Sequence, residues 1–502
     1  MRASHRQPRR AQPVRPEHLE RENDRLSREN EKLRQELIER DKKIADAEKQ
    51  IADLERKPGL RRQNSTTSSK PPSCDGLAGE QRKRGSRRKK SRRGPGGQPG
   101  HRGHWRGLAP LSRVDGVIEV FPPTCRHCDG RLSRRMSTEG EPRRHQVTEL
   151  PAIQAYITEY QCPCVVCAQC GKATQAELPP EAQGHFGPQL TALIAYLTVV
   201  CRMPRRMVRE LLEQVLAIPL SLGSIQNSWE EAAEAVAEPC AELEKQLPHE
   251  PVVNSDETGY RTSGEKRWMW ALVAANFVFY KIAASRGAEV LVELLGEVFA
   301  GILCSDRCAS CLKYHKGEGQ FCWAHFKRNI LGIQEIGKTT DAERFCRDAL
   351  ALHARLFRLW HRFRDGPGVR YGPITREQLI RKSIPLEKKF FALADRYLDS
   401  RDKDVANLAL ALLQHFERFF AFLRHEGVEP TNNVAERALR CAVPWRKISF
   451  GSRSAQGEVA VARLITATRT CRMQNIAPLD YLVAALRSYR SALPVPSLLK
   501  TA

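Results

Sequence analysis

The chain has 502 residues and a formal net charge of +24, with 82 Lys and Arg against 58 Asp and Glu. This length allows roughly two to four domains with sizeable cores. Residues 1–106 alone hold 30 basic and 15 acidic side chains, which favours a polyanionic partner, most simply nucleic acid. We expect neither a signal peptide nor a membrane-spanning helix, because the start lacks an apolar stretch and no apolar run reaches about eighteen residues.

A seven-residue repeat runs through residues 17–57. Leucine recurs at positions 19, 26 and 33, and the second repeat position holds Asn23, Asn30, Leu37, Ile44 and Ile51. This spacing predicts a coiled coil, and asparagine at two seam positions favours a defined register, as in a parallel dimer. A single solvated helix is the alternative. We therefore expect residues 1–57 to form a basic tail and a coiled coil that makes a homodimer.

Residues 58–110 are rich in Ser, Gly and Pro, which predicts a flexible linker. Its stretch RKRGSRRKKSRR, residues 82–93, carries nine cations in twelve residues. Such a run can follow DNA phosphates with little sequence preference, although a solubilising linker has the same composition. The candidate DNA-binding side chains are Arg82, Lys83, Arg84, Arg87, Arg88, Lys89, Lys90, Arg92 and Arg93.

Two C-x-x-C pairs lie in residues 111–180, Cys125 with Cys128 and Cys167 with Cys170. Each pair is followed closely by glycine, a pattern typical of the turn in which two thiolates bind one zinc. Two pairs predict a zinc-binding domain with one structural Zn²⁺ held by four thiolates. Cys162 and Cys164 could replace a ligand, and unmetallated cysteines or a redox pair are the alternatives.

The remaining chain alternates between helical and strand patterns. Residues 181–250 are predicted to be helical, either as a DNA-binding helix-turn-helix unit or as plain packing. In residues 251–445, three strand-like runs, a helix and a further apolar strand indicate a mixed α/β sheet, and residues 337–425 read as a helical insertion. Residues 446–502 are predicted to form a C-terminal helical domain. The fold class is therefore multidomain α+β.

Three carboxylates are candidates for a metal site. Asp256 is predicted to end the strand PVVNSD and Asp306 to end the strand GILCSD. If these strands are parallel neighbours, both carboxylates emerge at one edge and require a cation. Glu436, on a predicted helix with Arg437 and Arg440, could complete a site for two Mg²⁺ ions, and those arginines could meet DNA phosphates. The alternatives are turn formation at Asp256, helix capping at Asp306, and a capping box that pairs Asn433 with Glu436.

Several motifs, in order, resemble the insertion-sequence-66 family of bacterial DDE transposases over nearly the whole chain. They are SSKPPS (68–73), PGGQPGHRG (95–103), DETGYR (256–261), CWAHFKR (322–328), TNNVAERALR (431–440) and FGSRSAQGE (450–458). The resemblance implies an N-terminal coiled coil, a zinc-binding domain, and a ribonuclease-H-like catalytic core with a helical insertion. It implies that Asp256, Asp306 and Glu436 are the catalytic residues. The family usually has glycine and aromatic residues after the second aspartate, where this chain has Arg307, Cys308, Ala309, Ser310 and Cys311.

The function implied by the resemblance is DNA transposition in the bacterial cytoplasm, at the nucleoid. The protein would bind the ends of an insertion sequence, cleave DNA with two Mg²⁺ or Mn²⁺ ions, and transfer the strand to target DNA. Accessory proteins encoded by the same element are expected partners. Two alternatives stay open: a catalytically inactive zinc-domain DNA-binding protein, and a ribonuclease-H-like nuclease without strand transfer.

Overall fold

A computed structural model describes residues 107–499 except 152, 180–181, 183, 185, 338, 366–371, 442, 444 and 446–450, together with six isolated earlier positions. The predicted coiled coil and the basic stretch 82–93 lie outside the described residues, apart from helical positions at 28, 31, 32 and 35. The chain divides into two compact units. One includes Cys322–Glu426, and the other includes Gln81–Phe321 with Gly427–Ala502.

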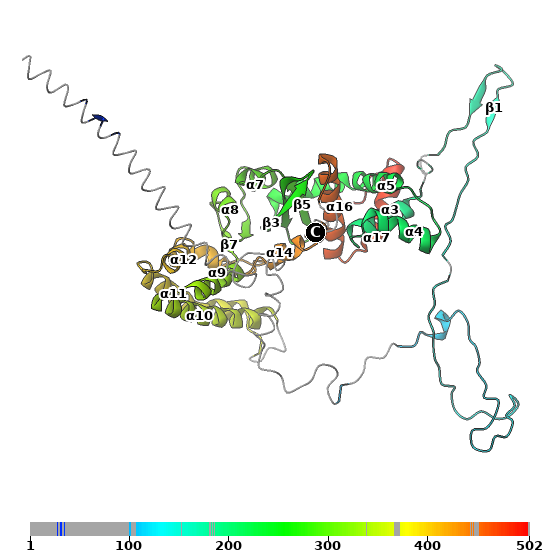
Figure 1. Cartoon of the computed structure of the whole chain (residues 1–502), viewed down its shortest axis with the longest axis horizontal. Helices are drawn as coiled ribbons and strands as arrows, with labels where there is room; N and C mark the ends of the chain where they lie inside the picture. Colours follow the sequence, from blue (N-terminus) through cyan, green and yellow to red (C-terminus); the bar gives the residue numbers. More distant parts are fainter. Residues whose placement is uncertain are drawn as a thin grey trace, which may run out of the picture. The chain divides into compact units, whose positions relative to one another are not determined.

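A five-stranded mixed sheet is the centre of the second unit (Figure 1). Its order is β5-β4-β3-β6-β7. The β3–β4 and β4–β5 pairs are antiparallel, whereas β3–β6 and β6–β7 are parallel. The strands are β3 (Val252–Thr262), β4 (Glu265–Val273), β5 (Val278–Ala283), β6 (Ile302–Ser305) and β7 (Gly319–Phe321). The mixed α/β sheet expected from the apolar runs is thus present.

The hairpin between β3 and β4 turns at Ser263 and Gly264, whose φ angles are 49° and 85°. Two consecutive left-handed residues are typical of the tight turn that suits twisted antiparallel strands. Because β3 pairs with β4 as far as Thr262, the first strand does not end at Asp256. That prediction was wrong: the run of polar residues after Asn254 continues the strand through hairpin pairing.

The segment after position 450 is fastened to this hairpin. Ser452 N–H donates to the Arg261 carbonyl at 3.0 Å, and Ser263 N–H donates to the Ser452 carbonyl at 2.9 Å. Gly451 has φ 97°, and a Cβ there would lie 2.0 Å from the Arg261 carbonyl oxygen. Only glycine therefore fits this close approach. The approach gives a physical reason for the glycine in FGSRSAQGE.

The edge strand β5 is covered by helix α16 (Ala455–Met473) (Figure 1). The Thr470 hydroxyl accepts from Val278 N–H and donates to the Val278 carbonyl, both at 3.2 Å. The Thr466 hydroxyl accepts from Tyr280 N–H at 3.0 Å. Both threonines are fully buried. Side chains four residues apart on one helix face thus replace a neighbouring strand, which closes an edge otherwise open to pairing.

Further helices pack around the sheet and beside it. Arg490, whose side chain is 5% exposed, forms a bidentate ion pair with Glu231 at 2.7 and 2.9 Å, joining the last helix to α5. The helices are α3 (Pro188–Val199), α4 (Arg205–Leu216), α5 (Leu222–Ala235), α6 (Ala237–Gln246), α7 (Ala288–Leu295), α8 (Ala309–Tyr314), α14 (Asn433–Leu439) and α17 (Pro478–Arg490).

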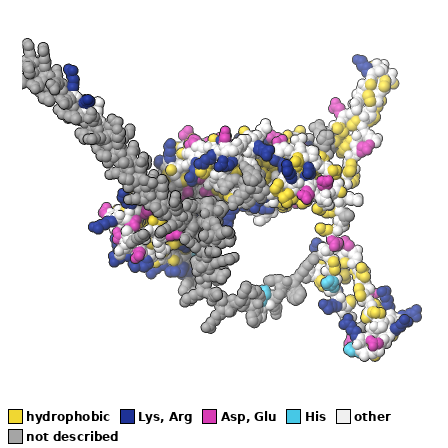
Figure 2. Space-filling view, viewed as in Figure 1, with side chains coloured by type: hydrophobic (Ala, Val, Ile, Leu, Met, Phe, Trp, Pro, Cys, Tyr) yellow, Lys and Arg dark blue, Asp and Glu magenta, His cyan; other side chains and the backbone are white. Residues whose placement is uncertain are grey.

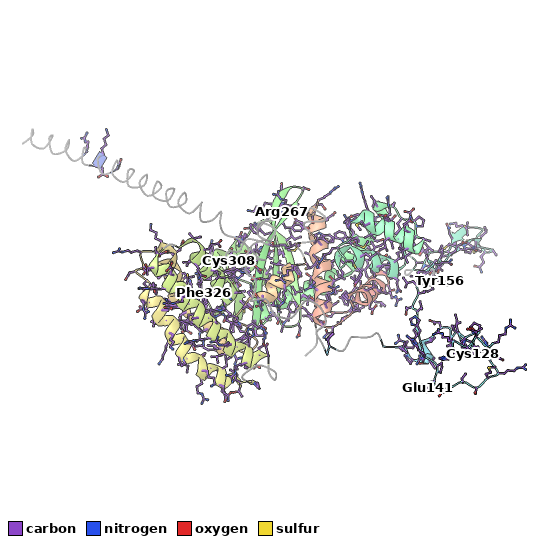
Figure 3. All side chains as sticks on the ribbon, turned by 60° about the horizontal axis from the view of Figure 1, so that its bottom comes forward. Cys128, Glu141, Tyr156, Arg267, Cys308 and Phe326 are labelled. Atoms are coloured by element: carbon purple, nitrogen blue, oxygen red, sulfur yellow. The ribbon has the colours of Figure 1, made fainter. Side chains whose placement is uncertain are left out.

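Residues 107–178 bury little surface. Among the described residues of this segment none is buried, and Ile118, Val120 and Tyr156 are 89%, 90% and 94% exposed. Hydrophobic side chains line its surface around β1 (Cys164–Val166), and Tyr156 projects from an extended stretch (Figures 2 and 3). The segment therefore lacks an apolar core of its own, which a small domain needs unless a metal or another staple holds it.

The other unit is helical where it is described after residue 321. Its helices are α9 (Trp323–Ile336), α10 (Thr340–Arg364), α11 (Arg376–Arg396), α12 (Lys403–Gln414) and α13 (Phe416–Arg424). Trp323 packs edge-on against Phe326 and Phe419 at ring-centroid distances of 5.3 Å. Helices α10 to α13 lie within the predicted helical insertion, residues 337–425, and α9 precedes it. No described helix is long and apolar enough to cross a membrane.

Candidate active site

Parallel pairing sets Asp256 and Asp306 at the same level of the sheet. Val252 pairs with Ile302 and Asn254 with Cys304, a constant offset along the two strands. The same offset places Asp256 opposite Asp306, which directly follows the last residue of β6. Neighbouring strands lie about 4.8 Å apart. The structure therefore brings the two predicted aspartates together, although Asp256 lies inside β3 rather than at its end.

Glu436 is carried by α14, which packs on β3 and β4. Asn432 precedes this helix, is 1% exposed, and donates from its side-chain amide to the Ser255 carbonyl at 2.8 Å. Its side chain does not cap the helix. The predicted capping box with Asn433 is wrong, because Asn433 is already the first helical residue. The polar side chain at this helix start joins the helix to the strand that carries Asp256.

Electrostatic repulsion links the three carboxylates. Burial and, after it, the negative charges of Glu257, Asp306 and Glu436 raise the pKa of Asp256 to about 8, and a backbone hydrogen bond from Glu257 opposes them. A carboxylate in such a place favours either a proton or a cation. The donor set is made of carboxylate oxygens, the ligands that Mg²⁺ and Mn²⁺ prefer. Asp256, Asp306 and Glu436 therefore have the chemistry of a divalent cation site, although in the described part of the chain their oxygens do not all lie within 4.8 Å of one another.

Glu257 and Arg286 were not identified from the sequence as site residues. The Glu257 side chain is 2% exposed, and its Oε1 accepts from Arg286 at 2.5 and 2.6 Å. Burial and Asp306 raise the pKa of Glu257, whereas Arg286 lowers it. The guanidinium also lies 5.0 Å from the centre of the Trp268 ring. Arg286 thus compensates a fourth carboxylate beside the three predicted ones.

The residues after Asp306 form a cysteine turn that leads into α8. Asp306 Oδ1 accepts from Cys308 N–H at 3.1 Å, which fixes the carboxylate against its own loop. Cys308 caps α8, with its Sγ accepting from Cys311 N–H at 3.3 Å, and the two Sγ atoms are 2.6 Å apart (Cys308 is labelled in Figure 3). The departure from the usual family sequence therefore leaves Asp306 held by a backbone donor.

Each predicted zinc pair forms the same local turn. Cys125 N–H donates to the Gly130 carbonyl, and Cys167 N–H donates to the Lys172 carbonyl, both at 2.9 Å. Asp129 and Gly171, four residues after the first cysteine of each pair, have left-handed φ angles of 55° and 68°. In the first turn the left-handed residue is thus Asp129, not the glycine beside it.

Backbone hydrogen bonds in these turns favour the thiolate form of the first cysteine of each pair. Backbone N–H groups of His127 and Cys128 hold the pKa of Cys125 below its usual value. Those of Cys170 and Gln169 do the same for Cys167. Each turn therefore fits half of a tetrahedral thiolate site. In the described part of the chain, the four thiols are not gathered into one group with ligand atoms within 4.8 Å.

The arginines predicted beside Glu436 lie at the surface. Arg437 and Arg440 are both exposed and follow Glu436 on and just after α14. They are thus available to a phosphate at this end of the sheet. The other predicted DNA-binding cations, in residues 82–93, lie outside the described residues.

Comparison with known proteins places the part of the chain that contains this sheet in a family of transposases. Residues 183–460 match the family model described as the transposase IS66 family. The match covers more than half of the 502 residues and includes Asp256, Asp306 and Glu436, so the chain belongs to the IS66 family of transposases. Residues 8–107 match a second family model, whose function is unknown.

Two relatives come from Sinorhizobium fredii. The uncharacterized protein y4qI is 26% identical over 264 residues, which is 47% of this chain and 47% of the relative. The uncharacterized protein y4hP is 25% identical over 411 residues, 75% of this chain and 72% of the relative. The first match thus spans about half of that relative, and neither name adds a substrate or an activity.

Proposed function

We propose that this IS66-family transposase cuts DNA at the ends of its insertion sequence and joins the released 3′ hydroxyl to target DNA. The observation that carries the proposal is the electrostatic coupling of Asp256 to Asp306 and Glu436, which together with burial and Glu257 raises the pKa of Asp256 to about 8. Accumulated negative charge of this kind is typical of a site for divalent cations.

Asp256, Asp306 and Glu436 would hold two Mg²⁺ or Mn²⁺ ions. When bound, such ions activate a water and stabilise the attacking and leaving oxygens of an in-line phosphoryl transfer. Asp306 is oriented by the N–H of Cys308. Glu436 is positioned through the bond from Asn432 to Ser255. Arg437 and Arg440, both exposed, would hold the DNA phosphates that flank the reacting bond.

The sheet supports a ribonuclease-H-like core. Three antiparallel strands, β3 to β5, are followed by β6, parallel to β3, and by β7, parallel to β6. The register of β3 and β6, extended by two residues, would set Asp256 level with Asp306. This arrangement agrees with the core that the family resemblance implies, with its helical insertion between β7 and the Glu436 helix.

The parts of the chain outside the sheet would bind the DNA ends and join two protomers. We infer that the cysteine turns bind one Zn²⁺ and that this domain, the helices after it and the basic stretch 82–93 recognise and hold the element ends. The coiled coil would join two protomers so that both ends are cut together. Proteins encoded by the same element would assist.

The cysteine turn after Asp306 keeps a second candidate function open, a DNA-binding protein without catalysis. A labelled duplex that carries the element ends, incubated with the purified protein and Mg²⁺, separates the candidates. Wild type is expected to cut and to form joined products, and Asp256→Asn is expected to bind but not cut. Cutting by Asp256→Asn would reject the assignment. Cuts without joined products would indicate a nuclease, and binding alone by wild type would indicate the inactive protein.

A further inference from the structure

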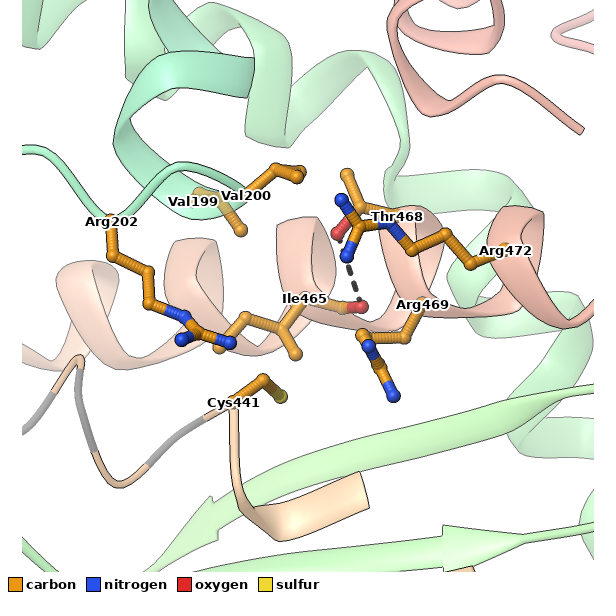
Figure 4. Close-up of a pocket in the computed structure, with 8 residues that line it drawn as sticks. All are labelled: Val199, Val200, Arg202, Cys441, Ile465, Thr468, Arg469 and Arg472. Carbon is orange, nitrogen blue, oxygen red and sulfur yellow. Dashed lines mark hydrogen bonds between the residues drawn. The ribbon is translucent and has the colours of Figure 1, made fainter. Parts of the chain in front are cut away.

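A shallow recess lies in the second unit (Figure 4). Its walls come from the connection between α3 and α4, from α16, and from the residue that follows the Glu436 helix. The lining residues are Val199, Val200, Arg202, Cys441, Ile465, Thr468, Arg469 and Arg472. Three of these eight are arginines, and none is acidic.

The positive charge of this recess is not compensated by the residues that line it. The buried Nε atoms of Arg202 and Arg469 have no hydrogen-bond partner among the described residues. A buried guanidinium donor without an acceptor is costly, and the cost is offset when an anion binds. Because the guanidinium fork matches two oxygens of a phosphate, a cluster of arginines is suited to a phosphate group.

The positive field extends beyond the lining. Arg205, three residues after Arg202, lies 4.9 Å from the centre of the Trp229 ring, and its buried Nε also has no partner among the described residues. Burial lowers the pKa of Arg205, whereas the charge of Glu230 raises it and that of Arg453 lowers it. Arg205 therefore adds a cation close in sequence to Arg202, which Glu230 compensates in part.

The backbone conformation of Arg202 also supports a binding role for its side chain. Arg202 has φ 61°, a left-handed conformation that glycine or asparagine adopts more easily at a helix end. A side chain with a Cβ is strained in this region. The backbone conformation therefore gives no reason for an arginine at position 202. The placement of its guanidinium in the recess does give a reason (Figure 4).

Hydrogen bonds connect the recess to the helix that carries Glu436. The Tyr280 hydroxyl donates to the Ala438 carbonyl at 2.7 Å and lies 3.4 Å from Cys441 Sγ. Arg469 also interacts with the Tyr280 hydroxyl. An anion on Arg469 would thus sit beside the end of α14.

We infer that this arginine recess, defined by Arg202, Arg469 and Arg472, binds a backbone phosphate of the DNA and so fixes the DNA relative to the Glu436 helix. The inference rests on the proposed function in taking DNA as the ligand. It adds a contact made by the folded body of the protein to those expected from the basic stretch 82–93.

The test is the salt dependence of DNA binding. Full-length protein carrying Asp256→Asn is titrated, without added Mg²⁺, into a fluorescent duplex of about 30 base pairs at several KCl concentrations. Each lost phosphate contact reduces the slope of log affinity against log salt by about one. Arg202→Gln and Arg469→Gln should each lower the slope by about one and weaken binding, whereas the Lys versions should keep the slope. Arg487→Gln, at an exposed site on α17, is the matched control.

The Asp256→Asn background separates binding from catalysis. The binding result can therefore be interpreted even if the cleavage proposal fails. Arg472→Gln, at an exposed side chain, gives a third variant in case Arg469→Gln does not fold. Slopes equal to the parent protein in all folded Gln variants would overturn the inference. A rise in Tm with inorganic phosphate that depends on Arg202, combined with unchanged DNA slopes, would also overturn it, in favour of a free-anion site.

Discussion

The side-chain amide of Asn432 donates a 2.8 Å hydrogen bond to the backbone carbonyl of Ser255, 177 residues earlier in the chain. Ser255 directly precedes Asp256, and Asn432 begins the turn that leads to Glu436. Both partners are buried, at 1% exposure each. One hydrogen bond therefore sets the distance between the strand and the helix that supply two of the three candidate metal ligands.

Replacing Asn432 by alanine should weaken both the fold and the proposed site. The Ser255 carbonyl would lose a buried donor, which costs about 1–3 kcal/mol. The loss is measured as a lower urea midpoint, and DNA cleavage should fall further than stability because Glu436 would no longer be held. Asn433→Ala is the matched control, since Asn433 is half-buried and is only the first helical residue. Equal effects of the two changes would contradict the role of the Ser255 bond.

The stability of the metal-free protein should fall as pH rises. The pKa of Asp256 is raised from its ordinary 3.8 to about 8, so the folded state keeps a proton that the unfolded state has lost. Its contribution is fully present below about pH 4 and is lost as pH increases toward about 8. Urea unfolding without divalent ions, at about pH 5 and about pH 8, measures the difference.

Asp256→Asn serves as the control for that pH series, because its side chain carries no charge at either pH. Its stability should change less between the two values. Added Mg²⁺ should stabilise the wild type most at the higher pH, where the proton no longer competes. An equally steep pH dependence in Asp256→Asn would show that another group is responsible.

The sequence predicted the sheet better than it predicted the site. The apolar runs in β4 and β5 identify those strands, because a buried strand needs continuous apolar residues. The end of β3 was misplaced because the polar residues from Asp256 onward look like a turn until their pairing with β4 is known. Asn432 and Asn433 are both good helix-capping residues, and only the distant Ser255 carbonyl decides what the first of them does.

Other parts of the site could not be read from local sequence. Glu257 looks like part of a turn, and its partner Arg286 lies 29 residues away. Arg202 and Arg469 are separated by most of the catalytic region, so no spacing rule joins them in one recess. The cysteine pairs, by contrast, were recognised because their geometry is local: each turn closes within six residues. Contacts set by long-range packing, such as those of Arg286, Arg202 and Asn432, therefore stayed hidden from local spacing.

Removing Arg286 should leave Glu257 buried without its cation. Arg286→Gln is expected to lower the free energy of unfolding by about 1–3 kcal/mol, less than for a fully buried pair because the guanidinium is half exposed. A double-mutant cycle with Glu257→Gln isolates the interaction. The double variant should be more stable than Arg286→Gln alone. A coupling energy near zero in urea unfolding would show that water replaces the guanidinium without cost.

Removing the hydroxyl of Thr466 should reopen the edge of the sheet. Thr466→Val keeps the shape but leaves Tyr280 N–H without its acceptor, at a cost of about 1–3 kcal/mol. Thr466→Ser keeps the acceptor and should cost less. Hydrogen exchange at Tyr280 should accelerate in the valine variant alone. If serine and valine destabilise equally, the packing of the methyl group, rather than the hydrogen bond, holds α16 on β5.

The two cysteine turns should share one Zn²⁺ per chain, although the described thiols do not form a single group. Residues 107–178 have no buried residue among those described, so a four-thiolate site would supply the cross-link that apolar packing does not. Metal analysis of purified protein should find zinc in the wild type and lose it in Cys125→Ser and in Cys167→Ser. Cys201→Ser, at an exposed thiol outside the segment, should keep it. Cys125→Ser could instead retain zinc and lose it only when Cys162 or Cys164 is also replaced. That result would identify the second replaced cysteine as a zinc ligand.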